Sequence, residues 1–213
     1  MKFLSTDSEK SDLKKTGLFG AGGDTIRVGR GIGFSLSDPN GAMAMELKAV
    51  MMKRRSVRRF TEEPVSREQT ETLLHHAMSG PSACNARPWE FFIVTRPETL
   101  EALRDAGRYT KHKAPLMIVV AGNMKKALPM QLRDFWIQDC SAAMENLLLS
   151  AVDLGLGACW EGLYPMKRMV ERVSKILNLE EHIIPLGMAA IGHSAEDPEP
   201  RDQYDPKRIH WVE

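Results

Sequence analysis

Residues 115–121, PLMIVVA, form an almost unbroken apolar run, which predicts a strand buried on both faces. Two further strands are predicted on either side of it in the sequence, at 89–95 (WEFFIVT) and 184–192 (IPLGMAAIG). A short strand is also expected before Trp160. Helical patterns alternate with these few buried strands, so the predicted fold class is α/β or α+β.

The helix signals lie between these strands. Ser66 and Gln69 have the spacing of a capping box, which predicts a helix beginning at Ser66, and Gly80-Pro81 is expected to end it. The longest helix is predicted from about 131 to 154, where a broad apolar stripe is followed by Gly155. Shorter helical segments are expected at 47–51, 98–107 and 169–177, and an extended arm at 195–213.

The composition is that of an ordinary globular chain. Of 213 residues, 43% are hydrophobic and 27% charged, which allows a sizeable core. The net charge of +1 argues against a general nucleic-acid or membrane-surface binder, and no apolar run approaches the roughly 20 residues of a membrane span. The three cysteines lie far apart, which favours reduced thiols and a cytoplasmic location over disulfides or structural zinc: Cys84, Cys140 and Cys159.

The first part of the chain differs from the rest. Eight of the 16 glycines lie within residues 1–41, which contain no Trp, Tyr, His or Cys. Such a segment buries too little apolar surface to offset its ordering entropy. Its glycines do not follow the GxGxxG pattern of a dinucleotide-binding loop. We therefore expect residues 1–43 to be a Gly-rich flexible arm or leader, and residues 44–213 to be the folded domain.

Five cations lie within residues 53–59 (KRRSVRR), directly after the first amphipathic turn. One interpretation is a solvated face whose positive charge is favourable near a helix C-terminus. Another is an anion site, because arginine forks bind phosphate bidentately and Ser56 adds a hydroxyl donor. A nucleic-acid site is disfavoured because the rest of the chain has no basic stripe. The sequence alone leaves the first two interpretations open.

Two loops contain small and polar residues at places where a ligand can approach the backbone. Residues 81–89 (PSACNARPW) form either a ligand-contacting loop or a plain helix-to-strand turn. Residues 155–165 (GLGACWEGLYP) contain glycines that permit close approach, or that simply end a helix. Cys159 has no nearby base and is interpreted as a core residue. The histidines are scattered, so no metal site is predicted.

Four segments in this order resemble the nitroreductase family of FMN enzymes: 46–60, 81–92, 154–165 and 191–211. The resemblance covers nearly all of 44–213. It implies a three-layer α/β/α fold of the α+β class, with a central mixed β-sheet flanked by helices. It also implies an intertwined homodimer that holds FMN at the subunit interface.

The resemblance also assigns cofactor-binding residues. It places Arg54 and Ser56 at the FMN phosphate or ribityl chain, Arg58 near the pyrimidine edge, and Arg55 at a further cofactor contact. It implies that a loop of the partner subunit reaches the flavin through Pro81, Ser82 and Asn85. Glu161 and Gly162 match a backbone segment near the flavin N5 and O4, and Arg201 matches a phosphate ligand.

The chain departs from the family pattern at two places. Gln203 stands where many members have a second basic residue after Arg201, so phosphate binding is expected to rely more on Arg54 and Arg208. Arg87 stands where many members have glutamine, which alters the pocket edge or faces solvent.

The implied activity is that of an NAD(P)H-dependent FMN oxidoreductase. Hydride is expected to pass through the flavin N5 in a ping-pong reaction to an electrophilic acceptor such as a nitroaromatic, quinone, enone or flavin. No catalytic side chain is assigned, since the flavin does the chemistry. The alternatives are a dehalogenase-like flavin enzyme, a flavin-binding or redox-sensing module without efficient turnover, and a phosphate- or nucleic-acid-binding domain.

Overall fold

The computed structural model describes residues 26–28, 32–34 and 45–213. The chain divides into two compact units, Met1–Ala44 and Met45–Glu213. In the first unit, β1 (Ile26–Val28) and β2 (Ile32–Phe34) pair antiparallel. The sequence does not predict this pair, because three-residue strands are too short to show a periodicity. The rest of the expected arm lies outside the described residues.

The second unit is built on a four-stranded sheet in the order β3-β4-β6-β5. Its strands are β3 (Trp89–Val94), β4 (Leu116–Asn123), β5 (Gly157–Gly162) and β6 (Ile183–Gly192). All three neighbouring pairs are antiparallel. The expected mixed sheet is therefore corrected: among the described residues, parallel pairing is confined to an isolated bridge between Ser56 and Ala158. The apolar pattern of a strand does not encode the direction of its neighbour, which is why the sequence could not decide this.

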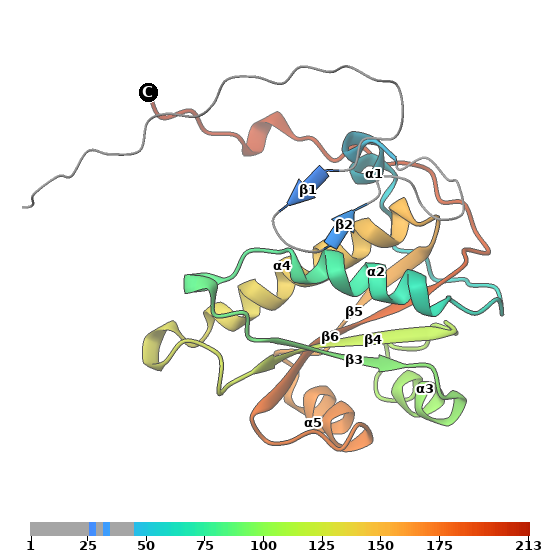
Figure 1. The fold of residues 1–213 in the computed structure, drawn as a ribbon, viewed down its shortest axis with the longest axis vertical. Coiled ribbons are helices and arrows are strands. Elements are labelled where there is room, and N and C mark those ends of the chain that lie inside the picture. The colour runs from blue at the N-terminus through green and yellow to red at the C-terminus, as the bar shows by residue number, and fades with distance from the viewer. Residues whose placement is uncertain (1–25, 29–31, 35–44) are drawn as a thin grey trace, which may run out of the picture. The chain divides into compact units, whose positions relative to one another are not determined.

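Helices cover both faces of the sheet (Figure 1). All eight positions of β4 are buried, as its apolar run predicts. Leu116, Ile118 and Val120 belong to one core cluster, whereas Met117 and Val119 belong to the other. This alternation follows from the period of two along a strand. The fold is thus α+β in three layers, with α2 and α4 on one face and α3 and α5 on the other.

The helices begin and end close to their predicted positions. They are α1 (Leu47–Lys53), α2 (Arg67–Met78), α3 (Pro97–Arg104), α4 (Phe135–Asp153) and α5 (Lys167–Ile176). Both hydrogen bonds of the Ser66–Gln69 capping box are present. The predicted 131–154 helix is instead divided: a short 3₁₀ turn (Met130–Leu132) precedes α4.

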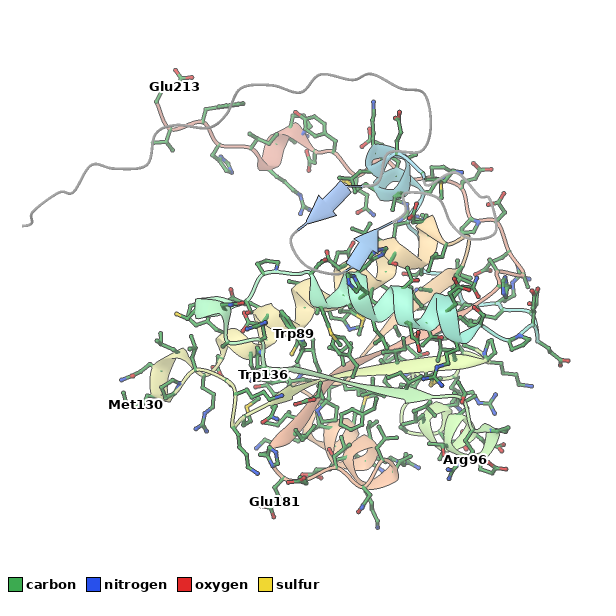
Figure 2. All side chains as sticks on the ribbon, in the orientation of Figure 1. Trp89, Arg96, Met130, Trp136, Glu181 and Glu213 are labelled. Atoms are coloured by element: carbon green, nitrogen blue, oxygen red, sulfur yellow. The ribbon has the colours of Figure 1, made fainter. Side chains whose placement is uncertain are left out.

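The longest helix, α4, supplies more buried residues to one core cluster than any other element. Trp136 at its start lies beside Trp89 of β3 (Figure 2), and both belong to the same buried cluster. Trp136 also packs edge-on against Tyr164, with ring centroids 5.0 Å apart. Among residues 45–213, no helix has the length and apolarity that crossing a bilayer requires.

Candidate functional site

The arginine-rich segment after α1 lies along the outer edge of β5. The backbone N–H of Val57 donates a hydrogen bond to the carbonyl oxygen of Ala158 at 3.0 Å, and Ser56 forms its bridge to the same residue. Val57 is buried, which anchors the segment by its apolar side chain. The basic residues on either side of Val57 are therefore held next to the strand that ends in Glu161 and Gly162.

The cations of this segment differ in their partners. Arg54 pairs with Glu145 of α4 at 3.3 Å, and Arg59 pairs with Glu196 at 3.0 Å. Glu196 also accepts a hydrogen bond from the backbone N–H of Arg58 at 2.7 Å. The hydrogen bond from the backbone N–H of Arg58, and then that from the Arg59 side chain, lower the pKa of the Glu196 carboxyl. Glu196 thus fixes the end of the segment by accepting hydrogen bonds from both Arg58 and Arg59.

Arg55 is the exception in this segment. Its Nε is buried and has no hydrogen-bond partner among the described residues. A buried charged donor left without an acceptor is unfavourable, because it has lost its hydration without compensation. The arrangement therefore favours an acceptor, such as an anionic oxygen, from outside this part of the chain.

At the end of β5, the buried Glu161 pairs with His112, which is half-buried. Oε1 of Glu161 lies 2.5 Å from Nδ1 of His112, while Oε2 is buried without a hydrogen-bond partner in residues 45–213. The Glu161 side chain is 1% exposed. Burial raises the pKa of Glu161, and the hydrogen bond from His112 opposes that shift. Burial therefore favours the neutral form of this carboxyl more strongly than in an exposed glutamate.

A pocket of about 250 Å³ opens at this pair. It is lined by side chains from the arginine segment, the loop after α3, and β5: Arg58, Arg108, Tyr109, Lys111, His112, Cys159, Trp160, Glu161 and Gly162. Gly162 is exposed, and a Cβ added there would meet nothing within 4 Å. Backbone at Gly162 is thus open to close approach by a ligand.

Cys159 lies in the wall of this pocket. It is buried, and burial raises the pKa of its thiol despite the nearby Arg58. Burial also raises the pKa of Cys140, in α4, to about 12. A thiol of raised pKa is a poor nucleophile because little thiolate forms near neutral pH. This agrees with the interpretation of Cys159 as a packing residue.

The loop that contains Pro81, Ser82 and Asn85 is held by α4 rather than by the arginine segment. The backbone N–H of Ala83 donates to Oδ1 of Asp139 at 2.8 Å. The Ser82 hydroxyl accepts from the backbone N–H of Arg87 at 3.0 Å, so its oxygen already serves the turn. Asn85 has a positive φ of 55° and is exposed.

The predicted residues therefore fall into separate groups. One group lies along β5 and at its end: Arg54, Arg55, Ser56, Arg58, Glu161 and Gly162. The second group is the 81–85 loop. Arg201 is exposed in the extended tail, as are Gln203 and Arg208, and within residues 45–213 no hydrogen bond or ion pair joins Arg201 or the loop to the first group.

Sequence reasoning did not find the residues that the loop after α3 contributes. His112, Arg108, Tyr109 and Lys111 line the pocket, although no motif marks them. His112 lies 49 positions before Glu161, and only the fold brings the two together. The nearest signal in the sequence is the density of basic and aromatic residues in 108–113 (RYTKHK).

The raised pKa of Glu161 predicts how the stability of the fold changes with pH. Because the folded pKa of Glu161 is raised, its contribution is fully present below the ordinary glutamate pKa, about 4.3, and is lost as pH rises through the raised value. We expect Glu161→Gln, which cannot ionise, to gain thermal stability relative to the wild type as pH increases across that window. Thermal melts from pH 4 to 8 measure this.

Glu180→Gln is the matched control. Glu180 also pairs with a histidine, His182, at 3.3 Å, but its side chain is 76% exposed. Exposed pairs contribute little to stability, so the difference in Tm between this variant and the wild type should stay flat with pH. An equally flat difference for Glu161→Gln would contradict the prediction.

Comparisons with known proteins agree with this arrangement. The Nitroreductase family model matches residues 51–108 and 105–193. A Methanothermobacter thermautotrophicus protein named "Putative NADH dehydrogenase/NAD(P)H nitroreductase" is 38% identical over 169 residues, covering 78% of this chain and 86% of its own length. A protein of the same name from Parabacteroides distasonis, solved as a crystal structure, has a TM-score of 0.73 at 34% identity, covering 78% of this chain and 96% of that one.

A further solved structure, an FMN-dependent nitroreductase from Clostridium difficile, has a TM-score of 0.70 at 27% identity. It covers 77% of this chain and 98% of that one. The family match spans the arginine segment, the 81–85 loop and β5 together. Fold, family match and sequence identity thus lead to one assignment: this chain is a member of the nitroreductase family.

Proposed function

We propose that this protein is an FMN-dependent NAD(P)H oxidoreductase that reduces an electrophilic acceptor in a ping-pong order. The observation that carries the proposal is the buried Nε of Arg55, which has no acceptor among residues 45–213, on a segment fixed against β5. Relatives named as NAD(P)H nitroreductase and FMN reductase support the same activity.

The residues of the β5 edge suit a flavin mononucleotide. Its phosphate requires cationic and hydroxyl donors, which Arg54, Arg55 and Ser56 supply. The open space at Gly162 suits a flat ring system that must approach the backbone closely. Bound FMN supplies the hydride and electron transfer. Of the chain's own residues, Arg58 lines the adjoining pocket, where its charge would stabilise negative charge at the pyrimidine edge.

The His112–Glu161 pair has a structural part in this proposal. Its hydrogen bond ties the loop after α3 to the end of β5. This fixes the backbone at Gly162, the place where the ring is proposed to lie. The pair thereby orients the site without itself transferring protons in the reaction.

We also propose that the site is completed in a homodimer. Within residues 45–213 no hydrogen bond or ion pair joins the 81–85 loop or Arg201 to the β5 group, so we infer that their proposed contacts with FMN come from a second copy. Large apolar side chains are exposed on α1 and on the tail, including Leu47 at 64% and Trp211 at 83%. In this arrangement residues 44–213 are the FMN-binding domain and residues 1–43 an appended arm.

An anaerobic visible spectrum tests the proposed function. The purified protein, or the protein after addition of FMN, is expected to show a flavin band that bleaches when NADH or NADPH is added. Continued NAD(P)H oxidation with an added quinone then separates an enzyme from a flavin-binding module, which would bleach once without turnover. A protein that stays colourless after FMN addition would contradict the proposal.

A further inference from the structure

A second cavity lies between the loop after α3 and helix α5. Its volume is about 570 Å³. Its charged lining residues are four cations and one carboxylate: Arg108, Lys111, Arg168, Arg172 and Asp105. Arg108 and Lys111 also line the pocket at Glu161, so the two cavities share a wall.

The fold brings these cations together from segments about sixty residues apart. A Cβ at Gly107 would lie 2.3 Å from Cε of Met169, so the loop packs directly on α5. Nη1 of Arg172 reaches the carbonyl oxygen of Ala106 at 3.5 Å. Inside the loop, the buried Thr110 hydroxyl accepts from the backbone N–H of Gly107 at 3.0 Å and donates to the carbonyl of Arg104 at 2.9 Å. The cations therefore lie on a helix and on a loop whose backbone is fixed by internal hydrogen bonds.

The positive charge of this lining exceeds its negative charge, since four cations face one carboxylate, Asp105. Within residues 45–213, none of the four cations forms an ion pair with a carboxylate. Arg168 and Arg172 stand four residues apart on one face of α5, where like charges are unfavourable. A cluster of cations with this excess of positive charge is stabilised by an anion that binds among them.

The chemistry favours a phosphate monoester as that anion. Arginine forks match phosphate oxygens bidentately, and a monoester carries about −1.5 to −2 charges near neutral pH. We propose that this cavity is a phosphate-monoester site. Resting on the proposed function, it would bind one of two phosphorylated small molecules at the shared wall: NADPH through its 2′-phosphate, or a free FMN acceptor through its 5′-phosphate.

Direct binding tests the site independently of turnover. Adenosine 2′-monophosphate and adenosine are titrated into the whole protein by calorimetry at low salt. The monophosphate is expected to bind at least tenfold more tightly, and the double variant Lys111→Ala/Arg168→Ala is expected to lose at least tenfold of that affinity. Lys113→Ala/Lys167→Ala is the matched control, because it removes exposed cations of the same two segments that do not line the cavity.

Kinetics identify the source of the phosphate. If the site binds the reductant, the Lys111/Arg168 double variant lowers kcat/KM for NADPH about tenfold and leaves that for NADH unchanged. If it binds the acceptor, the loss appears with free FMN and not with riboflavin. Equal losses for all four compounds, or equal binding of adenosine and its monophosphate, would overturn the proposal. If neither reductant is oxidised, the proposed function fails while the binding experiment still decides this site.

Discussion

Replacing Arg55 by alanine is expected to raise the Kd for FMN by about tenfold to a hundredfold, the value of one or two charge-assisted hydrogen bonds. The reason is the buried Nε of Arg55, which lacks an acceptor within residues 45–213. In the proposed complex a phosphate or ribityl oxygen is that acceptor. Quenching of free flavin fluorescence by the apoprotein measures the Kd.

Arg59→Ala is the control for this experiment. Arg59 lies in the same basic segment, but its Nε already pairs with Glu196 at 3.0 Å and its side chain is 75% exposed. Its removal is expected to change the Kd less than twofold to threefold. Melting curves of both variants show whether the fold is retained. An Arg55→Ala protein that is folded and binds FMN like the wild type would remove Arg55 from the site.

Gly122→Ala is expected to destabilise the fold by about 1–3 kcal/mol, a fall in Tm of roughly 2–12 °C. A Cβ at this position would lie 2.3 Å from Cε3 of Trp136. The indole has little room to move, because Trp136 is 2% exposed and packs against Tyr164. The added methyl group must therefore displace either the start of α4 or the end of β4. Differential scanning calorimetry measures the change.

The same substitution at Gly80 controls for the loss of glycine itself. A Cβ at Gly80 would come no closer than 3.4 Å to its nearest neighbours, which is ordinary contact. Gly80→Ala should therefore leave Tm within about 2 °C of the wild type. Equal melting temperatures for Gly122→Ala and the wild type would mean that α4 and β4 are not packed as tightly as described.

The features that sequence predicted are those with a local cause. The capping box needs only Ser66 and Gln69, three residues apart, and both of its hydrogen bonds are present. The buried character of β4 needs only a run of apolar side chains. The resemblance to the family also depended on local motifs, since each of the four segments that carry it is short and contiguous.

The features that sequence missed depend on contacts between distant segments. The pairing of His112 with Glu161 spans 49 positions and follows from the packing of the loop after α3 on β5. Positive φ angles at Cys84 (50°) and Arg87 (47°) occur at residue types that give no signal of a left-handed backbone. The direction of strand pairing was undetermined for the same reason: it is a property of the chain path and not of any strand.

The position of the arginine-rich segment has a consequence for the behaviour of many copies of this protein in solution. β5 is an outer strand of the sheet, and such a strand exposes backbone donors and acceptors to which another chain can add. The backbone N–H of Val57 donates to the carbonyl oxygen of Ala158, and Ser56 forms a bridge to the same residue, so part of this edge is already paired. The segment proposed to hold a cofactor therefore also covers part of this edge, so substitutions that loosen it should lower colloidal stability as well as ligand affinity.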